Sequence, residues 1–165
     1  MRGKIYKYLA DDHERLDALL ERAVLDPDNI DMSAYAQFRS GLLKHIAMEE
    51  KILLSAARRL RGDEPLPVAA RLRLDHGALT ALLVPTPTAS IVRAIRAILK
   101  AHNPIEEDAG GMYDQCEQLL GAEADQILAR LQTASEVKVL PHVDTPFVME
   151  AARRAVARAG YDLDL

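Results

Sequence analysis

Apolar residues recur along most of this chain at alternating steps of three and four positions, the spacing that keeps them on one face of a helix. Between these stretches lie loops rich in Asp, Asn, Gly and Pro. The helices predicted in this way cover about residues 4–25, 33–60, 68–84, 90–102 and 112–131, with Ser33 as the cap of the second. The predicted fold is all-α, and the apolar spacing is that of an antiparallel helical bundle.

The last part of the chain has a different character. Pro141 and Pro146 bracket an irregular segment, and residues 147–159 form a short Ala- and Arg-rich helical pattern. We therefore expect a helical-bundle domain over residues 1–132 and a C-terminal tail over residues 133–165. The tail helix is expected to pack on the bundle or on a protein partner.

Composition excludes several classes of partner. The 165 residues carry 21 Lys and Arg against 25 Asp and Glu, so no overall positive field attracts nucleic acid or an anionic membrane. The single cysteine, Cys116, cannot form an intramolecular disulfide, which suits a reducing compartment. No segment approaches the roughly 20 apolar residues that span a bilayer, and the N-terminus lacks a signal-peptide pattern. We expect a cytoplasmic protein that binds neither nucleic acid nor membrane.

The chain contains an internal repeat. Residues 12–20 match residues 75–83, and residues 43–50 match residues 99–107 with one extra residue before the histidine. Each half carries Asp-His on its first predicted helix and His-x-x-x-Glu-Glu on its second. The repeat predicts two similar helical hairpins.

Four of the five histidines lie on the apolar helix faces, one on each helix, and two glutamates share those faces. Residues four apart point the same way, so His45 is directed with Glu49, and His102 with Glu106. A buried carboxylate is costly unless it is paired or metal-bound, and no Lys or Arg occupies these faces. The six predicted metal ligands are His13, His45, Glu49, His76, His102 and Glu106.

Each hairpin thus supplies two imidazoles and one carboxylate, the donor set of non-haem iron sites with open positions, and two such sets predict two metals. The remaining polar residues near the motifs are assigned simpler roles. Glu50 and Glu107 are interpreted as solvated or outer carboxylates. Asp12 and Asp75 are placed where they can orient neighbouring imidazoles, but a surface role is favoured for both. Tyr35 and Tyr113 are interpreted as core aromatics, Cys116 as a buried apolar residue and His142 as exposed.

With its His…His-x-x-x-Glu unit used twice over about residues 5–132, the chain resembles the hemerythrin or HHE cation-binding family. The resemblance implies an antiparallel up-down-up-down four-helix bundle in which the same six residues hold two iron ions. Other divalent metals are expected to be able to replace iron in a purified sample. Members of this family bind dioxygen, sense oxygen, redox state or iron, or help repair iron centres damaged by nitric oxide. The chain is therefore expected to act in sensing, storage or protection, with O₂ or NO as a small ligand.

Two departures from the family pattern bear on the site. Oxygen-carrying members have a His-x-x-x-His pair on the third helix, but Thr80 stands four residues after His76, which implies a position left open at one metal. Asn103-Pro104 resembles a helix start. A helix break after His102 would make Glu107 or Asp108 a rival to Glu106 as the second carboxylate ligand.

Two other functions stay open on the sequence. One is a di-iron enzyme that acts on peroxide or oxygen, and the other is a structural or adaptor bundle with a weak metal site. The sequence offers no general acid–base set beyond the six ligands, so no catalytic residue is assigned and a non-enzymatic role is favoured.

Overall fold

The computed structural model describes residues 2–165, which form helices and no strand. Among these residues, no helix is both long enough and apolar enough to cross a membrane. The prediction of an all-α chain is confirmed. The elements in chain order are α1 (Lys4–Ala23), α2 (Met32–Met48), the π-helical turn η1 (Glu49–Leu53), α3 (Leu54–Leu60), α4 (Ala69–Leu82), α5 (Ala89–Glu107), α6 (Met112–Leu120), the 3₁₀ turn η2 (Gly121–Glu123), α7 (Ala124–Gln132) and α8 (Pro146–Arg158).

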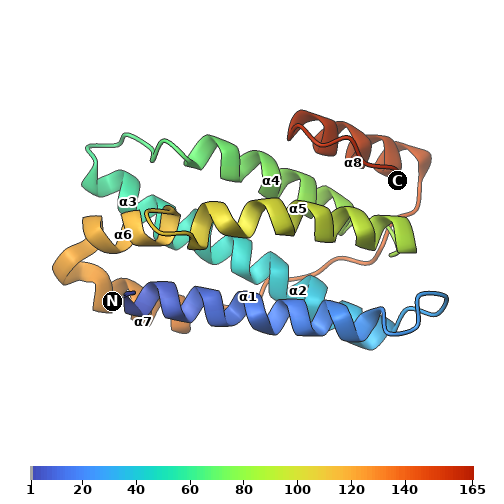
Figure 1. Cartoon of the computed structure of the whole chain (residues 1–165), viewed down its shortest axis with the longest axis horizontal. Coiled ribbons are helices and arrows are strands. Elements are labelled where there is room, and N and C mark those ends of the chain that lie inside the picture. The colour runs from blue at the N-terminus through green and yellow to red at the C-terminus, as the bar shows by residue number, and fades with distance from the viewer. Residues whose placement is uncertain (1) are drawn as a thin grey trace.

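Four long segments lie lengthwise beside one another: α1, α2 with its continuation through η1 and α3, α4, and α5 (Figure 1). Helix α1 contacts α2 and α5, and α4 contacts α5. Helices α6 and α7 cover the end of the molecule that holds the N-terminus, where both contact α1. Helix α8 lies along α4, so the tail packs on the long helices.

Side-chain caps fix where three of the helices begin. Asp31, and not Ser33 as predicted, caps α2, because its carboxylate accepts hydrogen bonds from the backbone N–H groups of Ser33 and Ala34, both at 3.0 Å. Thr88 caps α5 and Thr145 caps α8 through their hydroxyl oxygens. Each cap satisfies donors that the first helical turn cannot satisfy itself.

The second long segment contains a π-helical turn that the sequence pattern did not predict. The N–H of Leu54 donates to the carbonyl of Glu49, five residues back, and the hydroxyl of Ser55 donates to the carbonyl of Glu50 at 3.1 Å. Such turns are rare and often occur at functional sites. Here the turn begins at one of the predicted metal ligands.

Helix α5 continues to Glu107, so the break after His102 that Asn103-Pro104 left open does not occur. Pro104 removes one helical hydrogen bond, to the carbonyl of Lys100, but both residues lie on the exposed side, where that carbonyl can be hydrated. The chain then turns sharply into α6 at Gly111. A Cβ at Gly111 would lie 2.7–2.8 Å from three carbonyl oxygens near the end of α5, so this turn requires glycine.

Two apolar clusters fill the interior and leave a polar layer between them. The cluster on the side of α8 includes Leu16, Leu42, Leu79, Ile98, Ala152 and Val156. The cluster towards α6 and α7 includes Leu9, Met48, Leu53, Leu72, Cys116 and Leu131. Along each long segment a histidine of the predicted site falls between a residue of one cluster and a residue of the other.

Candidate metal centre

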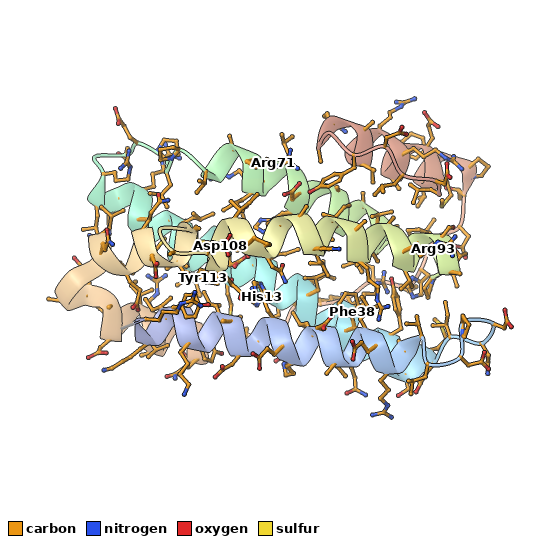
Figure 2. The ribbon with its side chains drawn as sticks, in the orientation of Figure 1. His13, Phe38, Arg71, Arg93, Asp108 and Tyr113 are labelled. Carbon is orange, nitrogen blue, oxygen red and sulfur yellow. The ribbon has the colours of Figure 1, made fainter. Side chains whose placement is uncertain are left out.

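The structure brings all six predicted ligand residues together in this polar layer. His13, the most exposed of the six, is 8% exposed, and both Glu49 and Glu106 are fully buried. Figure 2 shows His13 of α1 and Tyr113 of α6 in the space between α1 and α5. Placing six titratable side chains in an apolar interior costs several kcal/mol for each charged group unless they are paired or bound to a metal.

The six residues form two groups that share their carboxylates. One group contains His13 and His45, and the other contains His76 and His102; Glu49 and Glu106 belong to both. Within each group, one ligand atom from every residue lies within 4.8 Å of the others. Either group could hold a metal ion, and Glu49 and Glu106 would contribute a carboxylate to both groups.

The two oxygens of Glu49 face different groups. Its Oε1 lies 3.2 Å from Nε2 of His45, and its Oε2 lies 3.2 Å from Nε2 of His76. A carboxylate that presents one oxygen to each of two neighbouring sites has the arrangement of a bridging ligand.

Glu106 divides its oxygens in the same way. Its Oε2 lies 3.4 Å from Nε2 of His13, and its Oε1 lies 3.0 Å from Nε2 of His102. Three ligand atoms of the layer are buried without a well-formed hydrogen bond: Oε2 of Glu49, Nε2 of His76 and Oε1 of Glu106. Buried polar atoms are nearly always satisfied, so these three indicate a ligand such as a metal ion.

Every histidine of the site is held through its outer nitrogen by a carboxylate from another helix. These bonds run from Nδ1 of His13 to Glu107 (2.5 Å), of His45 to Asp12 (2.7 Å), of His76 to Glu50 (2.8 Å) and of His102 to Asp75 (3.2 Å). A carboxylate that accepts from Nδ1 fixes the tautomer and leaves Nε2 free to bind a metal. All four Nε2 atoms therefore point into the polar layer.

These four outer carboxylates form a closed ring around the site. Each adjoins a predicted ligand in the sequence of its own helix and supports the histidine of the next: α1 supports α2, η1 supports α4, α4 supports α5, and α5 supports α1. The internal repeat thus encodes both the inner ligands and the carboxylates that orient them.

Several sequence interpretations are corrected here. The surface role favoured for Asp12 and Asp75 is wrong, because Asp12 is half-buried and Asp75 is fully buried. Each accepts a hydrogen bond from an imidazole, which is the alternative that the sequence left open for them. Glu107 binds His13 from outside, while Asp108 is exposed, so Glu106 is the carboxylate inside the layer. His142, expected to be exposed, is half-buried and donates to the carbonyl of Val84 at 3.2 Å.

Thr80 does not face the site. It is exposed, and its hydroxyl donates to the carbonyl of His76 in its own helix at 2.7 Å. Thr80 is therefore not placed to line a metal position, and the helix supplies no second imidazole one turn after His76. The helix packs with Asp75 and His76 inward, and this leaves the position one turn later on the outer side.

Tyr113 is the site residue that the sequence interpretation missed. Its hydroxyl donates to Oε1 of Glu49 at 2.6 Å and lies 3.3 Å from Nε2 of both His13 and His45. Burial and the charges of Glu49 and Glu106 raise the pKa of Tyr113 well above its usual value, so the metal-free protein holds a neutral phenol. Tyr113 lies outside the repeat, so the repeat does not point to it. The one feature that could have pointed to it is that the hydroxyl of a buried tyrosine usually has a hydrogen-bond partner.

In the metal-free protein the carboxylates keep imidazoles protonated. Burial by itself lowers the pKa of His45, but the charge of Glu49 and the hydrogen bonds that the imidazole donates to Asp12 and Glu49 outweigh it and raise the pKa to about 10. The same opposition between burial and neighbouring carboxylates gives a pKa of about 11 for His76 and about 9 for His102. Protons therefore occupy the places that a metal would take.

No family model, curated protein or solved structure matches the chain. The assignment of the site consequently rests on its own atoms. Four inward Nε2 atoms, two shared carboxylates and three unsatisfied buried atoms fit a metal ion, and no other described group of His, Cys, Asp and Glu forms such a cluster.

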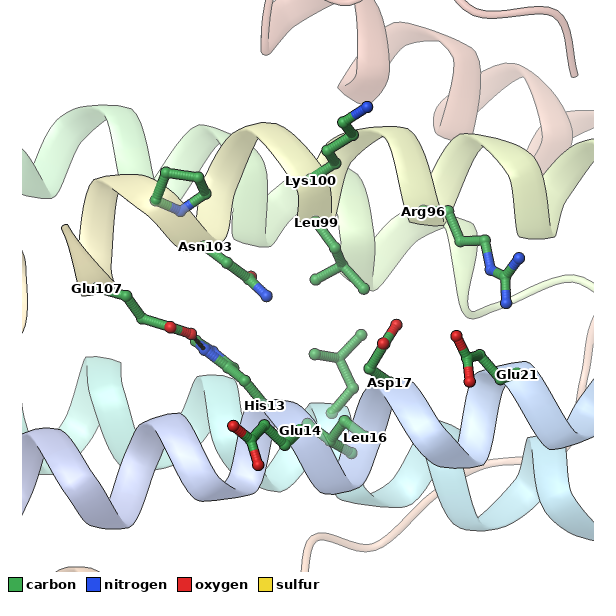
Figure 3. Close-up of a pocket in the computed structure, with 12 residues that line it drawn as sticks. His13, Glu14, Leu16, Asp17, Glu21, Arg96, Leu99, Lys100, Asn103 and Glu107 are labelled. Atoms are coloured by element: carbon green, nitrogen blue, oxygen red, sulfur yellow. Dashed lines mark hydrogen bonds and ion pairs between the residues drawn. The ribbon is translucent and has the colours of Figure 1, made fainter.

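A cavity of about 530 Å³ between α1 and α5 reaches the edge of this site (Figure 3). His13 and Glu107 form one end of the cavity, Leu16 and Leu99 face each other across it, and Asn103 projects into it from α5. Its volume is in the range of small-molecule sites. The most exposed histidine of the site is thus the one that a small molecule can approach.

Proposed function

We propose that this protein is a non-haem di-iron protein of the hemerythrin-like kind, with an antiparallel up-down four-helix bundle around the metal pair. The observation that carries the proposal is the sharing of Glu49 and Glu106 between two buried groups, each completed by two imidazoles. Imidazole and carboxylate donors without a thiolate suit iron, whereas structural zinc sites usually contain cysteine. The internal repeat supports two equivalent metal positions.

The proposed role is a response to oxygen, redox state, nitric oxide or iron, by sensing, storage or protection. Bound iron would supply the capacity to bind small oxidants and to exchange electrons. The chain itself orients the ligands through the ring of outer carboxylates and excludes water with its two apolar clusters. Electrostatically, the two inner and four outer carboxylates offset the charge of a metal pair.

Metal analysis tests this proposal directly. The protein loaded with Fe²⁺ without oxygen should retain two iron ions per chain after desalting, and its optical spectrum should change when the iron is oxidised and reduced. Failure to retain stoichiometric metal under these conditions would refute the proposal and favour a structural or adaptor bundle.

Tyr113 gives the site a spectroscopic test. Bound iron would offset the charges of Glu49 and Glu106 that raise its pKa, so the phenol could ionise and bind a ferric ion, which gives a visible absorption band. We expect Tyr113→Phe to lose that band and keep two irons per chain. Tyr35→Phe is the matched control, since Tyr35 is equally buried and its hydroxyl has no partner. An unchanged spectrum in Tyr113→Phe would exclude phenolate binding.

The cavity favours a second candidate, an enzyme that acts on peroxide or oxygen. Hydrogen peroxide can reach His13 through it, and disproportionation of two H₂O₂ to O₂ and two H₂O needs no other reactant. Leu99→Trp should fill the cavity and slow turnover without changing iron content. Leu74→Trp, at an exposed position of α4, is the control. No peroxide turnover by the iron-loaded wild type would exclude this activity and leave the first proposal standing.

A further inference from the structure

The end of the C-terminal tail is fixed to Arg71 of α4. After α8 the chain turns at Gly160, whose φ of +89° favours glycine, and the N–H groups of Gly160 and Tyr161 bond back to the last turn at 2.9 and 3.2 Å. This turn directs the carbonyl of Ala159 to Nη1 of Arg71 at 2.6 Å. A cation at the carbonyl end of a helix is favourable.

Arg71 in turn holds an outer carboxylate of the site. Its guanidinium binds both oxygens of Asp75, and it lies over the ring of Tyr161, 5.3 Å from the ring centre. Asp75 is fully buried and accepts from Nδ1 of His102 at 3.2 Å. Because Asp75 has no exposure to water, its orientation depends on Arg71 and the groups that fix Arg71.

This connection to the tail is particular to one of the outer carboxylates. Arg15 binds Asp12 at 2.8 Å and Arg73 binds Glu50 at 3.1 Å, so an arginine behind the carboxylate recurs. Within residues 2–165, however, neither of these arginines makes a hydrogen bond to the tail. Only the histidine of α5 is thus linked through its carboxylate to the end of α8.

We propose that the C-terminal tail is a positioning element for one metal of the pair. Ala159 and Tyr161 hold Arg71, Arg71 holds Asp75, and Asp75 orients His102, a ligand of only one of the two groups. The inference rests on the proposed function, because the affinity of that metal is the quantity the tail controls. Displacement of the tail would release one metal before the other.

The test removes one of the two tail contacts to Arg71, the ring of Tyr161, and leaves the long helices unchanged. Tyr161→Leu keeps an apolar side chain and removes the aromatic face from Arg71; its neighbour Asp162→Ala, at an exposed position, is the control. We expect Tyr161→Leu to weaken one of the two Fe²⁺ affinities about 10- to 100-fold and leave the other unchanged. Arg71→Gln should have the same selectivity, and Arg154→Gln on the exposed face of α8 should have no effect.

A second readout does not depend on metal. In the metal-free protein, the ring resonances of His102 should move in Tyr161→Leu, while those of His45 stay in place. Equal weakening of both metals, or unchanged affinities together with unmoved His102 resonances, would overturn the inference. If the wild type binds no metal, the proposed function fails, and the His102 resonances alone decide whether the tail positions this side chain.

Discussion

Glu49→Gln is expected to abolish tight binding of both metal ions, whereas His102→Ala abolishes binding of one. Glu49 contacts a histidine of each group through separate oxygens, so its loss removes a charged ligand from both sites. His102 belongs to a single group. Changes in outer residues alone lower metal affinity about 10- to 100-fold, so loss of a shared inner ligand should exceed that range at both sites. Iron content per chain and titration with Fe²⁺ measure the two outcomes.

Controls separate ligand loss from loss of folding. Glu150→Gln makes the same chemical change at an exposed position of α8 and should retain both metals. In the metal-free protein Glu49 pairs with two imidazoles. Breaking a buried ion pair costs about 3–5 kcal/mol, so the melting temperature of the Glu49→Gln variant should fall. Metal content is therefore compared at a temperature where circular dichroism shows both variants folded. Two tightly bound irons in folded Glu49→Gln would contradict the bridging role.

The inner site was predictable because helical periodicity determines which residues of one helix share a face. His45 with Glu49, and His102 with Glu106, follow from a spacing of four on a single helix. Helical spacing does not predict whether Pro104 ends α5. The proline lies on the exposed side of a helix whose opposite face is buried, so tertiary packing outweighs the loss of one hydrogen bond.

The histidine that each outer carboxylate supports could not be predicted from the spacing along one helix, because each of these contacts joins two helices. Asp12 lies next to His13 in sequence but supports His45, and Glu107 follows Glu106 but supports His13. Spacing along one helix does not state which neighbour a side chain reaches; that depends on helix packing. Tyr113 was missed for the same reason, since it enters the site from α6, outside the repeat.

The metal-free protein is expected to lose stability as pH rises above neutrality, and not as it falls from pH 7 to pH 5. If the imidazoles had their ordinary pKa of about 6.5, their protonation, and with it any change in stability, would occur near that pH. In the folded protein, however, the pKa is about 10 for His45, about 11 for His76 and about 9 for His102. The folded state therefore binds more protons than the unfolded state from about pH 6.5 upward, and stability falls through that window.

At low pH the carboxylates determine the stability of the metal-free protein, which there falls as the pH is lowered. Contacts with His45 and His76 lower the pKa of Glu49 although burial alone would raise it, and the pKa of Asp75 is lowered likewise by His102 and Arg71. Their stabilisation is complete above the ordinary carboxyl pKa of about 4 and is lost as pH falls through the lowered values. Thermal melts of metal-free protein should therefore give the highest melting temperature at about pH 5–6.5.

Metal binding should show the reverse dependence on pH, because the metal must displace the protons that these imidazoles hold. At pH 7, binding of the pair should release up to about three protons, one each from His45, His76 and His102, so the combined affinity should rise by up to about 10³ per pH unit towards pH 9. Calorimetry in two buffers of different ionisation enthalpy counts the released protons. The stabilisation by metal should consequently grow with pH, while the metal-free protein becomes less stable. Affinity that is flat between pH 6.5 and 8.5, or a metal-free melting temperature that falls between pH 7 and pH 5, would show that the imidazoles are neutral before the metal arrives.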